Sequence, residues 1–157
     1  MIETTIERWH QFLRGDLPGG LDELLHDDVA FLSPIVFSPQ RGKDLTKMYL
    51  QAAGATLGGS GDGAAKLGDA RADAGAEGVG PKFHYVAEVM SGHRAVLEFE
   101  SEVDGKYLNG VDIITCDDDG KIVEFKVMIR PLQAINAVHA AMKAMLERMQ
   151  AAAPAAD

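Results

Sequence analysis

The sequence holds a single cysteine, Cys116, which excludes an internal disulfide and any metal site built from several thiolates. Cationic residues are also few, because 15 lysines and arginines stand against 24 aspartates and glutamates and leave a net charge of −9. Since this charge repels phosphate backbones and the basic residues are scattered, we expect no nucleic-acid partner. No uninterrupted apolar run approaches the roughly 20 residues of a membrane span, so we expect no membrane partner either.

The five histidines, at positions 10, 26, 84, 93 and 139, lack the short spacings of metal ligands, and the acids near them form no recognisable metal loop. We therefore predict no metal and no cofactor. The chain begins MIETTIERWHQF, without the apolar core of a signal peptide, which predicts a cytoplasmic protein. Its 157 residues, 46% of them hydrophobic, fit one domain, which we place at 1–150 with a disordered tail at 151–157.

Apolar residues recur at helical spacing in the first third of the chain and predict three helices with one short strand before the third. Thr4 and Thr5 are both suitable caps for the first helix, and Gly15 ends it. The other expected ranges are 21–25 and 43–53 for helices and 29–32 for the strand.

Residues 54–80 differ in kind, because glycine and alanine make up more than half of them and large apolar side chains are nearly absent. Such a segment buries too little apolar surface to offset the entropy of ordering. We expect a flexible insert, with a lid over a pocket as the functional alternative.

Four strand signals follow, and the turn pairs Asp104-Gly105 and Asp119-Gly120 join strands as antiparallel hairpins. Pro131 closes the last strand and opens a helix that we expect to reach about Met149. The expected strands are 82–90, 93–103, 107–116 and 121–130.

Alternation within these strands predicts which side chains face the core. Leu97, Phe99 and Val103 alternate with three outward glutamates. The outward positions of strand 107–116 are more apolar than a solvated face requires, so we expect a homodimer through this sheet face. These outward residues are Tyr107, Asn109, Val111 and Ile113, and the inward residues of the last strand are Val123, Phe125, Val127 and Ile129.

Asp112 falls on the inward face of its strand, among small and apolar residues. A carboxylate in such surroundings is costly to keep charged, so it is hydrogen-bonded, paired, or protonated with a raised pKa. Two interpretations stay open: a structural acid bonded to a neighbouring polar side chain, or an acid that contacts a ligand or takes part in catalysis. The residues that share its face are Leu108, Gly110 and Ile114, and the possible bonding partners are Trp9, Ser33 and Tyr85.

Around Asp112 we predict an apolar pocket for a small, largely apolar ligand. Parity with Ala87 and Val89 directs Tyr85 inward, and Gly110 leaves space beside the carboxylate that suits a ligand. Asp112 is the candidate catalytic residue. The candidate ligand-binding residues are Trp9, Phe31, Ser33, Tyr85, Leu97, Phe99, Phe125, Val127 and Ile129.

The last third of the chain, GVDIITCDDDGKIVEFKVMIRPL, resembles the nuclear transport factor 2-like superfamily in its strand with an inward acid, its DG turn and its final strand. The opening helix, FLSP and RGKDL also fall where that family places them. The resemblance covers most of the chain except 54–80 and the final helix. It implies an α+β fold: a cone-shaped roll of a curved antiparallel sheet, three N-terminal helices packed on its concave face, and an extra C-terminal helix.

Within that superfamily, the ketosteroid isomerase branch is similar at one of its three pocket groups. Asp112 matches the acid on the penultimate strand that donates to the oxyanion. Ser33 stands where that branch has its aspartate base, and Trp9 stands near the place of its tyrosine. Because neither side chain can replace those groups, we do not expect ketosteroid isomerase chemistry.

Two other branches also resemble the chain. The limonene epoxide hydrolases need an arginine two residues before the strand acid and a second acid on the last strand, where this chain has Gly110 and Phe125. Polyketide cyclases of the SnoaL type need an inward acid, and Asp112 fits that role, with His10 or His84 as possible helpers.

Two function classes therefore stay open from the sequence. The first is a small-molecule binder or enzyme with isomerase-, cyclase- or hydratase-like acid-base chemistry at Asp112. The second is a non-catalytic dimeric protein-interaction module, in which side chains fill the interior and the sheet face binds the partner.

Overall fold

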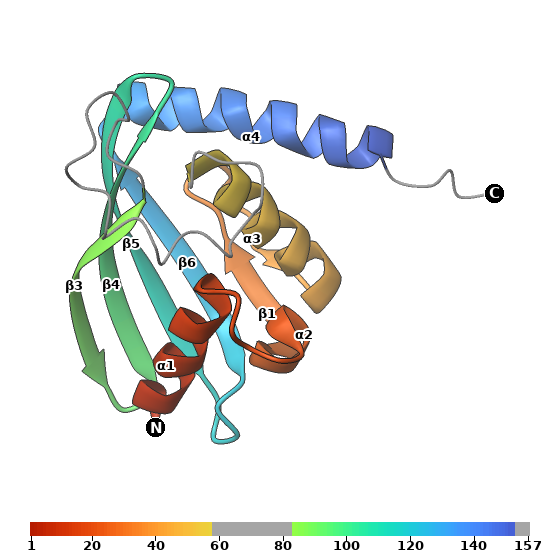
Figure 1. Ribbon diagram of the computed structural model, residues 1–157, viewed down its shortest axis with the longest axis vertical. Coiled ribbons are helices and arrows are strands. Elements are labelled where there is room, and N and C mark those ends of the chain that lie inside the picture. Colours follow the sequence, from red (N-terminus) through yellow and green to blue (C-terminus); the bar gives the residue numbers. More distant parts are fainter. Residues whose placement is uncertain (58–82, 153–157) are drawn as a thin grey trace.

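The computed structural model describes residues 1–57 and 83–152, in which helices cover the concave face of a curved, open sheet (Figure 1). The sheet order is β2-β1-β6-β5-β4-β3, with β1 parallel to β6 and all other neighbours antiparallel. The expected α+β cone is confirmed. The elements are α1 Ile2–Leu13, α2 Gly20–Leu24, β1 Leu25–Leu32, β2 Gln40–Arg41, α3 Lys43–Leu57, β3 His84–Ser91, β4 Arg94–Val103, β5 Lys106–Cys116, β6 Ile122–Arg130 and α4 Leu132–Ala152.

Helix α1 lies on the sheet through an apolar stripe at helical spacing, which includes Ile2, Ile6 and Trp9. The expected cap at Thr4 or Thr5 is wrong, because the helix begins at Ile2 and has no side-chain cap. The Thr5 hydroxyl is buried and donates to the carbonyl oxygen of Gly120 at 3.0 Å. A tertiary contact to the turn between β5 and β6 thus uses the hydroxyl that local sequence assigned to capping.

Three elements are longer than expected. α4 continues to Ala152, so residues 151–152 of the expected disordered tail are helical. β1 begins at Leu25, which pairs with Ile122 of β6, so sheet pairing extends it beyond the expected 29–32. α3 continues to Leu57, so residues 54–57 of the expected flexible insert are helical. The remainder of that insert and residues 153–157 of the expected tail lie outside the described residues.

Irregularities in two strands change the inward set. The pairing of β3 with β4 shifts register between Tyr85 and Ala87, so Tyr85 points inward as expected while Ala87 and Val89 face outward. The pairing of β6 with β5 shifts near Cys116, which places Ile122 in the core. The expected inward position of Val123 is therefore wrong. A single extra residue in one strand inverts every parity beyond it.

The buried side chains form two apolar clusters on the concave face. One lies beneath α1 and α2, and the other lies beneath the first turns of α4. Tyr85 and Val127 pack against both clusters. Asp112, paired in register with Leu97 of β4 and Val127 of β6, lies at the junction of the two clusters.

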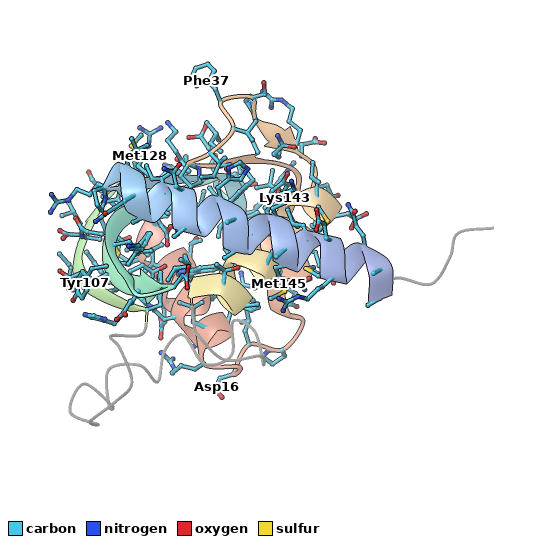
Figure 2. All side chains as sticks on the ribbon, turned by 90° about the horizontal axis from the view of Figure 1, so that it is seen from above. Asp16, Phe37, Tyr107, Met128, Lys143 and Met145 are labelled. Carbon is cyan, nitrogen blue, oxygen red and sulfur yellow. The ribbon has the colours of Figure 1, made fainter. Side chains whose placement is uncertain are left out.

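Helix α4 crosses the end of the sheet at which β6 finishes (Figure 1). Ala134 and Val138 near its start are buried, whereas Lys143 and Met145 lie on opposite sides of its less covered second half (Figure 2). In the described part of the chain, no helix combines the length and the apolar character needed to cross a membrane.

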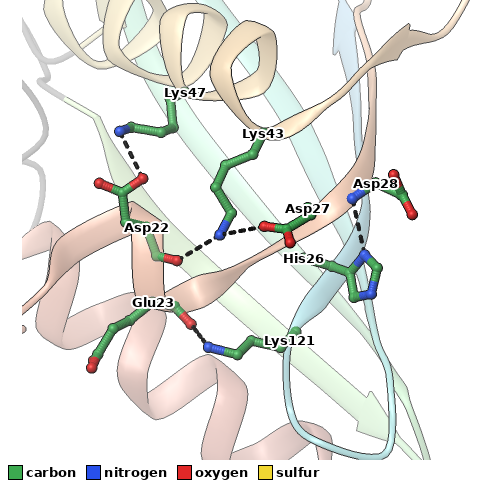
Figure 3. Close-up of polar contacts among 8 residues, drawn as sticks. All are labelled: Asp22, Glu23, His26, Asp27, Asp28, Lys43, Lys47 and Lys121. Atoms are coloured by element: carbon green, nitrogen blue, oxygen red, sulfur yellow. Dashed lines mark hydrogen bonds and ion pairs between the residues drawn. The ribbon is translucent and has the colours of Figure 1, made fainter.

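Charged side chains join α2, β1, α3 and the turn before β6 at the surface (Figure 3). Lys43 Nζ lies 3.0 Å from Asp27 Oδ1 and donates to the carbonyl oxygen of Asp22, while Lys47 Nζ donates to Asp22 Oδ1 at 2.9 Å. Lys121 donates to the carbonyl oxygen of Glu23. These contacts lie against water, where such pairs contribute little, so we assign them to holding the register of the α2–β1 corner.

Candidate functional site

Asp112 lies on the inward face of β5, and only 5% of its surface is exposed. Strands β4 and β6 pair with β5 on its two sides, so the carboxyl rises from the middle of the sheet rather than from an edge. The inward position predicted from alternation is therefore correct.

A chain of two hydrogen bonds holds the carboxyl. The Tyr85 hydroxyl donates to Asp112 Oδ2 at 2.6 Å, and the Trp9 indole N–H donates to the Tyr85 hydroxyl oxygen at 3.0 Å. Trp9 comes from α1, Tyr85 from β3 and Asp112 from β5, so three segments far apart in sequence meet here. Of the expected partners of Asp112, Tyr85 is the direct one, Trp9 acts through Tyr85, and Ser33 is bonded within its own turn.

Burial raises the pKa of Asp112 to about 7, and the hydrogen bond from Tyr85 opposes this rise. The pKa of Tyr85 lies well above its ordinary value, first because of burial and then because of the Asp112 charge, so its hydroxyl keeps its proton. At neutral pH the carboxyl is present in both protonation states, and it can donate or accept a proton.

A cavity of about 50 Å³ opens beside the carboxyl. It brings Asp112 together with five of the nine predicted ligand-binding residues, and helix α3 supplies the opposite wall. The lining residues are Trp9, Phe31, Leu50, Ala53, Gly54, Leu57, Phe83, Tyr85, Asp112, Phe125 and Val127. Among the described residues, the polar side chains of this lining are those of the hydrogen-bonded chain, and every other side chain is apolar.

A groove of about 280 Å³ adjoins this cavity and lies beneath α4. Phe31, Ala53, Leu57 and Val127 line both spaces, so these side chains are the partition between them. Ser33 and Ile129, two further predicted ligand residues, line the groove and not the cavity. The Ser33 hydroxyl accepts a hydrogen bond from the backbone N–H of Ile35 at 3.0 Å and thereby shapes its own turn.

Leu97 and Phe99, the last two predicted ligand residues, line neither space and are almost fully buried in the core. The expectation that Gly110 leaves room for a ligand is wrong. A Cβ atom at Gly110 would lie 2.5 Å from Phe99 Cζ and 2.5 Å from the carbonyl oxygen of Met128. The Phe99 ring occupies the space that the glycine side chain leaves.

The sequence did not identify the helical walls of the site. Ala53 and Gly54 of α3 face the cavity, and Met142 and Leu146 of α4 face the groove. The small Ala-Gly pair was the available signal, because small side chains at the end of a helix leave space against a neighbouring sheet. The sequence analysis divided this pair, because Ala53 ended the expected helix and Gly54 began the expected insert.

A larger hollow, of about 670 Å³, lies between α1 and β3, and Asp112 is not among its lining residues. Its wall includes His10, whose Nε2 lies 2.5 Å from Glu88 Oε1 and whose ring packs edge-on against Tyr85. His10 therefore covers the outer side of the Tyr85 ring rather than facing solvent alone. We place the candidate site at the smaller cavity, because the buried ionisable group lies there.

No protein-family model matches the sequence, and no curated protein matches it. Among solved structures, the chain is similar to a steroid delta-isomerase from Pseudomonas aeruginosa, with 30% sequence identity and a TM-score of 0.74 over 96% of this chain and 95% of that protein. It is also similar to an uncharacterised bacterial protein with a cystatin-like fold from Silicibacter pomeroyi, with 26% identity and a TM-score of 0.64 over 89% and 83%.

An NTF2-like protein of unknown function from Mesorhizobium loti shares the fold, with 18% identity and a TM-score of 0.58 over 83% of this chain and 91% of that protein. The near-complete coverage at 30% identity agrees with the cone, the sheet order and the inward acid on the penultimate strand. The chain belongs to the nuclear transport factor 2-like superfamily.

Proposed function

We propose that this protein binds a small, largely apolar molecule whose polar end reaches Asp112. The observation that carries this proposal is a buried carboxyl at the wall of an apolar cavity. Among the described residues, this carboxyl accepts a side-chain hydrogen bond from Tyr85, and no cationic side chain lowers its pKa. A buried acid with a purely structural role is most stable when both of its carboxylate oxygens accept hydrogen bonds. Asp112 Oδ1 accepts no side-chain hydrogen bond among the described residues, which leaves it for a ligand.

The apolar body of the ligand would extend past Leu57 and Val127 into the groove beneath α4. The two spaces, of about 50 and 280 Å³, together reach the lower end of the roughly 300–1,000 Å³ that is usual for ligand pockets. The two spaces share four lining residues, so a ligand that occupies both would displace side chains among them.

Acid-base chemistry at Asp112 is the reaction class that the site favours, because a carboxyl with a pKa near 7 gives and takes protons at neutral pH. The similarity to a steroid delta-isomerase supports this class. A mechanism with a separate carboxylate base is not favoured, because Ser33 lies in the groove wall and bonds to its own turn. Asp112 would then serve alone as proton donor and acceptor.

The single tryptophan makes the proposal testable without a known substrate. Trp9 lines the cavity, so its fluorescence reports occupancy. We expect 4-phenylcyclohexanone, an apolar ketone, to bind at least about tenfold more tightly at pH 5.5 than at pH 8.5, because only the neutral carboxyl donates to a carbonyl oxygen. Phenylcyclohexane, which has no carbonyl group, should bind with little pH dependence.

Asp112→Asn should abolish the pH dependence of ketone binding, whereas Asp118→Asn, the same change at an exposed acid, should leave it intact. Ketone binding that is indifferent to Asp112→Asn and to pH between 4 and 9 would contradict the proposal.

A second candidate function, a homodimer through the outer sheet face, is favoured by exposed apolar side chains on that face. Val89, Tyr107 and Met128 are 67%, 53% and 51% exposed. Sedimentation velocity should give a dimer at about 50 µM that Met128→Glu dissociates, because a charge would be buried at the interface. A monomer at that concentration would contradict this candidate and leave the ligand proposal unaffected.

A further inference from the structure

We infer that Trp9 is a positioning residue: its indole N–H fixes the Tyr85 hydroxyl as a donor to Asp112, which leaves Oδ1 as the carboxyl oxygen of Asp112 that meets the ligand. The part of this inference that concerns a ligand rests on the proposed function. The direction of the hydrogen bonds is a property of the ligand-free protein and can be tested separately.

The side chains of Trp9 and Tyr85 differ in whether they can donate or accept a hydrogen bond. An indole N–H donates and never accepts, whereas a phenol hydroxyl has one proton and also accepts. Trp9 Nε1 lies 3.0 Å from the Tyr85 oxygen, so that oxygen must be the acceptor. The single hydroxyl proton of Tyr85 is then free to point at Asp112 Oδ2, 2.6 Å away. The order of donation, Trp9 to Tyr85 to Asp112, is fixed by chemistry and not by the assignment of hydrogens.

The direction of these hydrogen bonds decides which oxygen of the Asp112 carboxyl carries the proton. Because Oδ2 receives the Tyr85 proton, the proton of the neutral carboxyl resides on Oδ1. Tyr85 is fully engaged by its two neighbours and has no proton to offer a ligand. The site therefore presents one proton donor to a ligand below the pKa of Asp112 and one acceptor above it.

Few other titratable groups among the described residues lie near the hydrogen-bonded side chains of Trp9, Tyr85 and Asp112. Beyond the outer side of the Tyr85 ring, α1 contributes His10 and β3 contributes Glu88, which form a pair at 2.5 Å. The neighbours of Asp112 on β4 and β6 are the apolar Leu97 and Val127. The wall from α3 is apolar as well. Variants at Asp112 and at the His10–Glu88 pair therefore identify which of these neighbours a pH response of the Trp9 signal reports.

The first experiment uses the unmodified chain. A single tryptophan gives a single indole ¹⁵N–¹H signal in the NMR spectrum. We expect that signal to shift with a midpoint near pH 7, because ionisation of Asp112 strengthens the donation from Tyr85 and so polarises the bond from Trp9. Asp112→Asn should remove this transition, and Tyr85→Phe should remove it as well.

The paired variants His10→Asn and Glu88→Gln serve as controls and should leave the transition near pH 7 in place. An indole signal that does not move between pH 5 and 9, that moves equally in Asp112→Asn, or that follows His10 would overturn the inference.

The second experiment removes only the donor. Because the chain has one tryptophan, incorporating 3-benzothienylalanine in place of tryptophan changes Trp9 alone and replaces N–H by sulfur with nearly the same shape. The pKa of Asp112, followed by its carboxyl ¹³C signal, should rise by a few tenths of a unit, since neighbouring hydrogen bonds strengthen one another by roughly 10–30%. Tyr85→Phe should raise that pKa further, by about one to two units.

A purely structural role for Trp9 predicts no change of this pKa in the isosteric variant, and an unchanged or lowered value would overturn the inference. Should that variant not fold, the indole titration of the natural chain decides. All of these measurements are made without ligand, so a failure of ketone binding would contradict the proposed function and not the role of Trp9.

Discussion

The protein contains carboxyl groups in two opposite environments. Asp22 and Asp27 lie at the α2–β1 corner, where hydrogen bonds from Lys47 and Lys43 hold their pKa values below the ordinary range (Figure 3). Asp112 lies among apolar side chains with one phenol as partner, and burial raises its pKa to about 7. The paired charges at this corner therefore support the surface structure, and the isolated acid is the candidate for chemistry. The candidate site is marked by a buried carboxyl without a nearby opposite charge, and not by a high number of charged groups.

Of the substitutions considered, Asp112→Asn should change the free energy of unfolding the most. A carboxyl whose pKa rises from 3.8 to about 7 on folding binds its proton more tightly in the folded state, so the free energy of unfolding falls as the pH rises from about 4 to 7 and stays low above that. The three units correspond to ~4 kcal/mol. Asparagine keeps an oxygen for Tyr85 and carries no charge.

Urea denaturation at pH 4.5 and pH 8 measures this effect. The variant should be more stable than the natural chain at pH 8, by up to ~4 kcal/mol, and similar to it at pH 4.5. A variant that is less stable than the natural chain at pH 8 would show that the Asp112 carboxylate is stabilised by its surroundings, contrary to the contrast drawn with the surface carboxylates.

Tyr85→Phe should destabilise the protein more at pH 9 than at pH 5. At pH 9 the tyrosine donates to a charged carboxylate, which contributes about 1.5–3 kcal/mol, and at pH 5 it donates to a neutral carboxyl, which contributes about 0.5–1.5 kcal/mol. The same denaturation series measures both values. Equal losses at the two pH values would mean that Asp112 does not titrate between them.

Gly110→Ala tests whether the space around Asp112 extends to Gly110. A Cβ atom at this position meets backbone and a buried ring at 2.5 Å, so overpacking should cost about 1–3 kcal/mol. Val111→Ala, at the neighbouring outward position, is the control. Equal stability of the two variants would indicate an open space beside Gly110 after all.

Asp22→Asn and Asp27→Asn should have the smallest effect. A lowered pKa means that each carboxylate adds stability above its unfolded pKa, and that this contribution disappears as the pH falls through the folded value. Because both groups lie against water, the loss at pH 7 should be close to experimental error and should vanish in 1 M salt. A loss as large as that of Tyr85→Phe would remove the contrast between the two regions.

The sequence placed Asp112 correctly because β4 and β5 alternate without interruption over the stretch around it. It failed at Val123 and at Ala87, because a register shift has no signature in the alternation of side chains. It also placed Leu97 and Phe99 at the ligand, although both fill the core. An inward side chain and a cavity-lining side chain look alike in sequence, since both are apolar and share the same parity.

The sequence was enough to predict most of the elements and the inward acid, because these follow from local periodicity, turn chemistry and the need to bury one face of each element. The cone was implied by the resemblance to a known family. Only the tertiary structure decided that Tyr85 and not Ser33 bonds to that acid, that Phe99 closes the space at Gly110, and that α3 and α4 wall the cavity and the groove. These facts depend on distances between segments far apart in the chain, and such distances are set by packing geometry that periodicity does not encode.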